Sequence, residues 1–176
     1  MQRAIITETE AYIGPHDLAS HASRGRTPRT ALMFGNPGFL YVYLVYGLHH
    51  CVNVVTERQG YPAAVLIRSV LPFIDTPVKM VRPDHFDWRG RAGGNVITGP
   101  GRVTKSLGID RQYNCADAVT SRRVWFERGV HVPARAIMRA PRIGVAYAGA
   151  WQYKPWRFTI AHPIDKKMTG HGPDHG

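Results

Sequence analysis

The feature that most restricts the fold of this chain is the segment at residues 39–56, which is rich in β-branched and aromatic residues around Gly47. It reads FLYVYLVY before this glycine and LHHCVNVVT after it. Two such runs on either side of a glycine are typical of antiparallel strands joined by a tight turn. Because side chains alternate along a strand, we expect Tyr41 and Tyr43 on one face and Tyr46 beside the turn. The sequence therefore predicts a protruding β-hairpin.

Other segments predict shorter elements. We expect extended segments at 5–12 and 63–71, and shorter strands at 123–127, 143–147 and 156–160. Short helices are expected at 15–22, 75–82 and 99–107, with a basic loop at 23–29.

The frequency of turn-forming residues indicates how these elements combine. The chain has 18 glycines and 13 prolines, spread along its 176 residues, which implies many turns and short elements. We expect an α+β fold with one compact domain over residues 1–165. Its curved, mainly antiparallel sheet would carry peripheral short helices and the protruding hairpin. Residues 166–176 would form a flexible tail.

The charge balance points to a polyanionic partner. The sequence has 23 Lys and Arg against 12 Asp and Glu, a net charge of +11, which suits nucleic acid, an anionic membrane surface or solubility alone. No apolar run approaches the roughly 20 residues that span a bilayer, and the N-terminus has no signal-peptide layout. Two cysteines do not suit a disulfide framework. We expect an intracellular protein that does not enter membranes.

Glu10 is the first candidate for chemistry. It lies in an extended segment whose alternation places Glu8, Glu10 and Tyr12 on one face. Two acids on a solvated strand face are the ordinary reading of such a segment. A functional reading needs a partner and a pocket, and Arg68, embedded in an apolar strand, requires an anion and could pair with Glu10.

The tyrosines admit two readings. Tyr12, Tyr41, Tyr43 and Tyr46 could be ordinary sheet core. Alternatively, four amphipathic rings near a basic loop could form a surface on which nucleobases stack.

Other reaction classes have weaker support in the sequence. Two groups of residues could be imagined as metal ligands: His16, Asp17 and His21, or His49, His50 and Cys51. Neither group has the spacing of a recognised zinc site, so we expect no metal and no cofactor. The glycine-rich residues 90–94 lack the Gly-Lys-Ser/Thr ending of a P-loop, and no Gly-x-Ser-x-Gly motif is present. A hydrolase that uses a carboxylate and water is the plausible enzyme.

The motifs, taken in order, resemble the alkyladenine (3-methylpurine) DNA glycosylase family. The resemblance begins with ETEAYIGP from Glu8, is followed by Ala-Ser-His and Thr-Pro-Arg, and continues through the hairpin to Asn53. It resumes at VLIR up to Arg68, at TGPGRVTKSLGI from Thr98, and at KPWRF from Lys154, so it covers most of residues 5–160.

The resemblance implies a role for each matched residue. Glu10 would activate the attacking water, and Arg68 would hold that water and the phosphate of the flipped nucleotide. Tyr12, His21 and Tyr43 would be the walls between which the base stacks, and Asn53 would disfavour the amino group of guanine. Tyr46 would be the wedge in the minor groove. We expect the basic side chains to contact DNA phosphates: Arg24, Arg26, Arg29, Lys154 and Arg157.

The implied activity is base excision repair of duplex DNA by a monomer. The substrates would be alkylated or deaminated purines, of the 3-methyladenine, 7-methylguanine, hypoxanthine and ethenoadenine type, and the product an abasic site. No lysine occupies the matched pocket positions, which favours a monofunctional glycosylase. The resemblance also implies a strand and helix before the glutamate strand, which we expect this chain to lack, since nine residues precede Glu10.

Two alternatives from other classes make different predictions. A non-catalytic nucleic-acid-binding module would use the same basic, tyrosine-rich surface. A metal-dependent hydrolase would use the histidines. Residues 86–95 and the tail after Ala161 carry no assigned role, nor does His49, where relatives have an aromatic residue.

Overall fold

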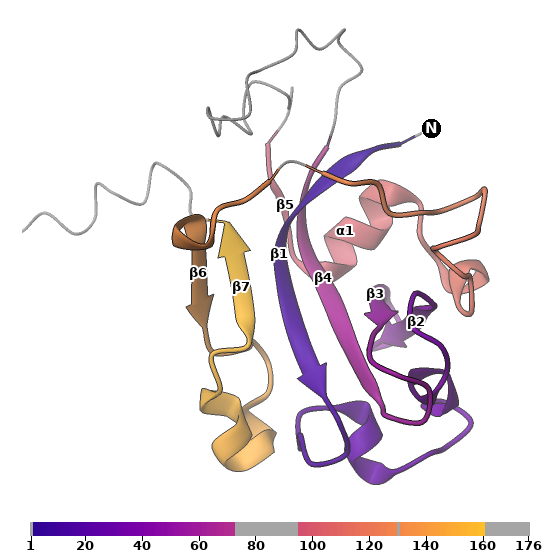
Figure 1. Cartoon of the computed structure of the whole chain (residues 1–176), viewed down its shortest axis with the longest axis vertical. Helices are drawn as coiled ribbons and strands as arrows, with labels where there is room; N and C mark the ends of the chain where they lie inside the picture. Colours follow the sequence, from indigo (N-terminus) through magenta and orange to yellow (C-terminus); the bar gives the residue numbers. More distant parts are fainter. Residues whose placement is uncertain (1, 73–94, 130, 161–176) are drawn as a thin grey trace, which may run out of the picture.

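The computed structural model describes residues 2–72, 95–129 and 131–160, and contains one antiparallel sheet of seven strands (Figure 1). The strands follow the order β2-β3-β4-β1-β7-β6, and β5 pairs with β4. Their bounds are β1 Ala4–Ile13, β2 Leu40–Val45, β3 His49–Val55, β4 Ala63–Pro72, β5 Ile97–Thr98, β6 Ile137–Ala140 and β7 Arg157–Ile160. The helices of the described part are α1 Pro100–Leu107 and the 3-10 helices η1 His21–Arg24, η2 Ala31–Phe34, η3 Arg111–Tyr113, η4 Ala134–Ala136 and η5 Ala146–Tyr153. The α+β prediction is confirmed.

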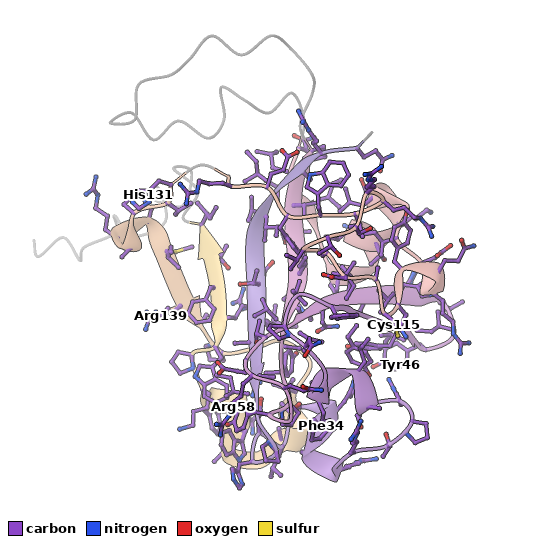
Figure 2. The ribbon with its side chains drawn as sticks, turned by 45° about the vertical axis from the view of Figure 1, so that its right-hand side comes forward. Phe34, Tyr46, Arg58, Cys115, His131 and Arg139 are labelled. Carbon is purple, nitrogen blue, oxygen red and sulfur yellow. The ribbon has the colours of Figure 1, made fainter. Side chains whose placement is uncertain are left out.

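The hairpin forms as the tyrosine-rich segment predicts. β2 pairs with β3 from Leu40 opposite Val54 to Val45 opposite His49. Tyr46, Gly47 and Leu48 connect the strands, and the Leu48 N–H donates to the Val45 carbonyl at 3.1 Å. Tyr46 and Gly47 both have positive φ, 52° and 69°, the pair of conformations found at the two central residues of a type I′ turn. The Tyr46 side chain is 92% exposed there (Figure 2).

The two long strands β1 and β4 pair through an irregularity at the middle of the sheet. Ile6 lies opposite Val70 and Thr9 opposite Ile67, while Thr7 and Arg68 have no directly opposed partner. Such bulges bend a strand and redirect side chains. This bulge delivers Arg68 to the acidic side chains of β1.

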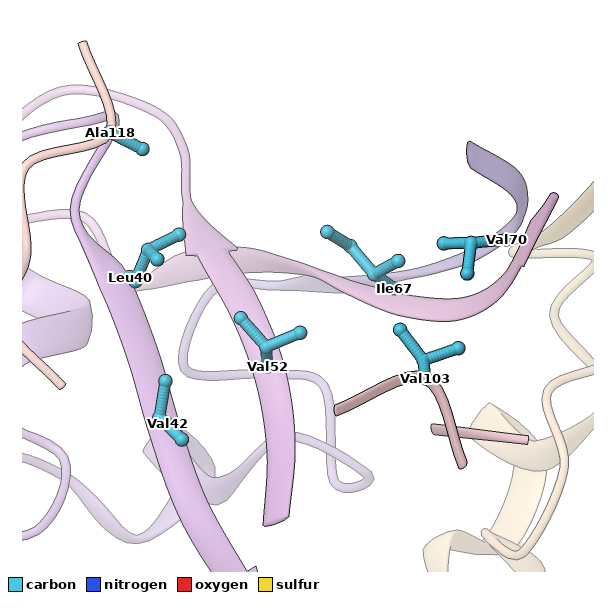
Figure 3. Packing of buried hydrophobic residues seen from close by; sticks show 7 residues of the cluster. All are labelled: Leu40, Val42, Val52, Ile67, Val70, Val103 and Ala118. Atoms are coloured by element: carbon cyan, nitrogen blue, oxygen red, sulfur yellow. The ribbon is translucent and has the colours of Figure 1, made fainter. Parts of the chain in front are cut away.

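One face of the sheet is covered by α1. Val103 of this helix is fully buried in the main core cluster, together with Leu40 and Val42 of β2, Val52 of β3, Ile67 and Val70 of β4, and Ala118 of the segment after η3 (Figure 3). The helix approaches the hairpin closely, since a Cβ built on Gly101 would lie 2.9 Å from the Cβ of His49. This face is apolar core.

The opposite face carries the pocket, because Tyr41 alternates with the core residues Leu40 and Val42. There the 3-10 helices supply the cover: Ala22 and Met33 pack against the sheet. A third cluster joins Ala19 to residues of η5 and its N-cap, namely Val145 and Ala148. Figure 1 shows η5 and the loops around η1 at the same end of the sheet.

Some predicted elements are wrong, and hydrogen bonds explain why. Residues 15–20 form turns instead of a helix, because the Asp17 carboxylate accepts the backbone N–H groups of Ile13 and Ala19 (3.3 and 3.1 Å). Residues 123–127 form no strand, and neither does 143–147, where the Ile143 N–H bonds to a side chain. Strand β6 was not predicted. The expected helix at 75–82 and the tail lie outside the described residues.

Among the residues that the structure describes, none of the helices has the length and apolar content that crossing a bilayer requires.

Candidate active site

Glu10 lies at the centre of the sheet, on β1 between β4 and β7. Its side chain is fully buried, so it is not the solvated acid of the ordinary reading. The Tyr12 hydroxyl donates to Oε2 at 2.9 Å and the Ile143 N–H donates to Oε1 at 2.7 Å. The Arg68 Nε lies 3.4 Å from Oε1. Every one of these neighbours stabilises a carboxylate with a fixed orientation.

Glu8 is a second carboxylate in the same cluster, and we assigned it no role from the sequence. Its Oε1 accepts from the Nε of Arg68 at 3.3 Å and from Nη1 of Arg157 at 3.1 Å, and its Oε2 accepts from the Ser69 hydroxyl at 2.6 Å. Burial raises the pKa of Glu8. The hydrogen bonds from Ser69 and Arg157 and the charge of Arg68 together outweigh burial, so the pKa of Glu8 lies below its usual value. Arg68 is therefore shared between two carboxylates.

The remaining donors of Arg68 are left for a ligand. Its side chain is 11% exposed, and its Nε faces Glu8 and Glu10. Within the described part of the chain, Arg68 forms its side-chain hydrogen bond through Nε, and neither Nη forms one. A guanidinium held at one nitrogen, with two nitrogens available, can bind water or phosphate.

A pocket opens beside Glu10 on the same face of the sheet. The four residues predicted to surround the base, Tyr12, His21, Tyr43 and Asn53, all line it. Its floor lies on β3 and β4, where Asn53 and Ala64 separate Tyr12 on β1 from Tyr43 on β2. A small side chain at position 64, directly opposite Tyr12, leaves room for a flat ligand.

One wall of this pocket is a continuous set of rings. His21 meets Tyr43 edge-on, with ring centroids 4.6 Å apart, and Tyr43 lies 5.2 Å from Tyr41. The Nδ1 of His21 lies 3.1 Å from the Tyr41 hydroxyl. The Arg29 guanidinium lies 5.3 Å from the Tyr43 ring centre. These contacting rings form one side of the pocket, and Tyr12 lines it from β1.

Burial sets the protonation states of the pocket. It raises the pKa values of Tyr12 and Tyr43, and the charge of Glu10 raises that of Tyr12 further, so both phenols stay protonated and act as donors. Burial, with the charges of Arg29 and Arg24, lowers the pKa of His21 to about 4. His21 is neutral at pH 7, and the aromatic wall carries no charge.

The depressed pKa of His21 predicts a loss of stability in mild acid. The unfolded chain binds a proton at this residue below about pH 6.5, while the folded chain does so only below about pH 4. Between these values the unfolded state holds more protons, so the free energy of unfolding falls as pH falls. Urea titrations at pH 7 and pH 5 should show a smaller drop for His21→Gln than for the wild type. An equal drop in the free energy of unfolding for both proteins would contradict a lowered pKa of His21 in the folded state.

A second buried assembly, which the sequence did not reveal, holds the site together. Arg142 forms a fully buried, bidentate ion pair with Asp17. It also donates to the carbonyl of Ala11 at 2.9 Å, and its guanidinium lies 4.7 Å from the Tyr12 ring centre. The next residue is Ile143, whose N–H reaches Glu10. This loop therefore fixes both the catalytic candidate and one pocket wall.

The comparisons with known proteins identify the family. The family model described as methylpurine-DNA glycosylase (MPG) matches residues 1–163. The chain belongs to this family. The resemblance noted in the sequence is thereby confirmed.

Individual relatives of this glycosylase family agree. A protein of Myxococcus xanthus (strain DK1622) is 44% identical over 171 residues, 97% of this chain and 78% of the relative. One from Methanocella arvoryzae is 46% identical over 154 residues, 87% of this chain and 74% of the relative. One from Ehrlichia ruminantium is 43% identical over 159 residues, 90% and 74% respectively. Each is named "Putative 3-methyladenine DNA glycosylase".

The residues expected to contact DNA in this glycosylase lie in different settings. Tyr46 stands at the exposed end of the hairpin. The cations Arg24, Arg26, Arg29 and Lys154 are exposed. Arg157 instead belongs to the Glu8 cluster, where its Nε also donates to the Pro141 carbonyl at 2.9 Å.

The histidine sets considered as metal ligands are not assembled. Within residues 2–72, 95–129 and 131–160, no group of three or more His, Cys, Asp or Glu side chains could hold an ion. In the first set, Asp17 is engaged by Arg142.

Proposed function

We propose that this chain removes 3-methyladenine and related methylated purines from duplex DNA by hydrolysing the N-glycosidic bond, with Glu10 activating the water. The observation that carries the proposal is the buried Glu10 carboxylate, which the Tyr12 hydroxyl and the Ile143 N–H hold in one orientation beside the aromatic pocket. Arg68 lies next to this carboxylate and keeps both Nη groups available for a ligand. The names of the relatives supply the substrate class.

The reaction begins with the damaged nucleotide outside the base stack, since an enzyme cannot reach the glycosidic bond of a stacked base. The purine stacks between Tyr12 and the wall formed by His21 and Tyr43. A methylated purine carries positive charge, and His21, which is neutral at pH 7, adds no further positive charge beside it. Asn53, fixed by donation to the Tyr41 carbonyl at 3.2 Å, hinders the amino group of guanine.

Bond cleavage then depends on the charged cluster. As the purine leaves, the sugar gains oxocarbenium character, which the Glu10 carboxylate stabilises. Glu10 takes the proton of the attacking water, and the free Nη groups of Arg68 hold that water or the adjacent phosphate. Glu8 keeps Arg68 in place at 3.3 Å.

The proposal extends to further substrates and excludes strand cleavage. 7-Methylguanine, like 3-methyladenine, is a positively charged purine with a weakened glycosidic bond, although it keeps the amino group that Asn53 hinders. Hypoxanthine and ethenoadenine are neutral and would leave after protonation of the ring. No lysine lines the described pocket to form a Schiff base, so the enzyme would be monofunctional. We propose that the exposed cations and Arg157 contact DNA phosphates during this reaction.

The proposal is tested by incubating the full chain with methylated duplex DNA and measuring free purine and abasic sites. Release of 3-methyladenine supports it. Binding to the DNA without any release would favour the non-catalytic module.

Tyr46 provides a separate prediction. As a wedge it fills the space that the flipped nucleotide vacates, so Tyr46→Ala should slow base release from a paired lesion by about tenfold or more, the cost of losing one stacked aromatic ring. Release from a lesion in single-stranded DNA should change little. Tyr153→Ala, 72% exposed on η5, is the control. Equal slowing on both substrates would assign Tyr46 to folding instead.

A further inference from the structure

A groove of about 600 Å³ opens directly beside the base pocket. It is lined by the segment before η1, by η1, by the loop that follows η1, and by Tyr147 of η5. Ser20, His21 and Tyr147 line both the groove and the pocket. A ligand in the groove is therefore an immediate neighbour of a base in the pocket.

The chemistry of the groove differs from that of the pocket. Arg24 and Arg29 line the groove together with the hydroxyls of Ser23 and Thr27. The positive charges of both arginines reach His21, which lines both the groove and the pocket, because they contribute to its lowered pKa. A positively charged methylpurine is repelled by such a groove, whereas a phosphodiester with its sugar is attracted.

The loop that carries these cations is ordered in advance. The Thr30 hydroxyl donates to the Gly25 carbonyl at 2.9 Å and accepts from the Thr27 N–H at 2.8 Å. Thr30 is itself buried. Binding therefore requires little loss of backbone entropy.

Tyr147 adds an aromatic platform at the edge of the groove. Tyr147 is 71% exposed, yet its hydroxyl donates to the Ala19 carbonyl at 3.2 Å, which anchors a ring that lines both the groove and the pocket. An exposed ring held in place by its polar end offers a face on which a base can stack.

We propose that this groove binds the nucleotide next to the flipped one in the same strand, with Arg24 and Arg29 on its phosphate and Tyr147 stacked on its base. The inference rests on the proposed function, since the pocket must hold the flipped nucleotide. It assigns the enzyme a second nucleotide subsite, so that binding of the damaged base would be coupled to binding of its neighbour in the same DNA strand.

The test measures binding of the full chain to duplexes with an abasic tetrahydrofuran at the lesion position. Tyr147→Ala should bind about tenfold more weakly, as expected for the loss of one base stack. Tyr147→Phe keeps the ring but loses its anchor to the Ala19 carbonyl, so it should lose less affinity than Tyr147→Ala. Tyr153→Ala removes an equally exposed ring of η5 outside the groove and should bind like the wild type. Retained thermal melting shows that Tyr147→Ala is folded.

A second tetrahydrofuran on one side of the lesion then removes the neighbouring base. On that duplex, Tyr147→Ala and the wild type should bind equally, while removal of the base on the other side should leave the tenfold difference. Arg24→Gln and Arg29→Gln should each lower the slope of log affinity against log salt by about one, and Arg139→Gln, on β6 at the far edge of the sheet, should not. Wild-type binding by Tyr147→Ala, or a deficit that no neighbouring base affects, would overturn the subsite. Absence of purine release by the wild type would instead refute the proposed function.

Discussion

Glu10→Gln should reduce release of methylated purines by about 10²- to 10⁴-fold, the usual contribution of a general base, while leaving binding to lesion-containing DNA intact. The amide has nearly the same shape, and it can still accept a hydrogen bond from Tyr12 or Ile143. It can neither take a proton from water nor carry the charge that stabilises the oxocarbenium ion. Single-turnover base release and equilibrium binding measure the two effects separately.

The matched control is Glu57→Gln, which changes an exposed acid in the connection between β3 and β4. It should release purines at the wild-type rate. Normal turnover by Glu10→Gln would remove Glu10 from the mechanism, and a parallel loss of binding and thermal melting would give it a structural role only.

Asp17→Asn should have the largest effect on stability, lowering the free energy of unfolding by about 3–5 kcal/mol, as for other broken buried ion pairs. The substitution leaves the Arg142 guanidinium fully buried without its anion. Because Arg142 also holds the Ala11 carbonyl and lies on the Tyr12 ring, the loss should reach the pocket as well. Urea denaturation measures the change.

The comparison for this variant is an exposed ion pair. Glu127 pairs with Arg3 at 3.3 Å, with both side chains 50% exposed, so Glu127→Gln should change the free energy of unfolding by less than about 1 kcal/mol. A loss for Asp17→Asn no larger than this would show that the buried pair does not stabilise the fold.

The sequence predicted those elements whose pattern is local and long. The hairpin and the strands β1 and β4 contain enough β-branched residues for their own sequence to predict them. The segments 15–22 and 143–147 were mispredicted because side chains take up their backbone N–H groups, a nearby side chain in the first segment and a distant one in the second. Asp17 closes a turn under Arg142, and the Ile143 N–H is used by Glu10, 133 residues earlier. No local periodicity records such contacts.

The candidate site shows the same division. Glu10, Arg68 and Tyr12 could be named in advance, from a buried arginine that needed an anion and from the family resemblance. Glu8 could not be distinguished from a surface acid, because its contact with Arg68 depends on the bulge that turns Arg68 toward it. Arg142 looked like one of many arginines, since only the fold shows that it is the buried partner of Asp17.

The most direct test of the central claim is single-turnover release of 3-methyladenine from methylated duplex DNA, measured for the full chain with chelator and with borohydride present. The account predicts free 3-methyladenine at the same rate under both conditions, uncleaved strands that carry abasic sites, and no protein trapped on the DNA. A chain that binds this DNA and releases no purine, or that becomes covalently trapped by borohydride, would contradict it.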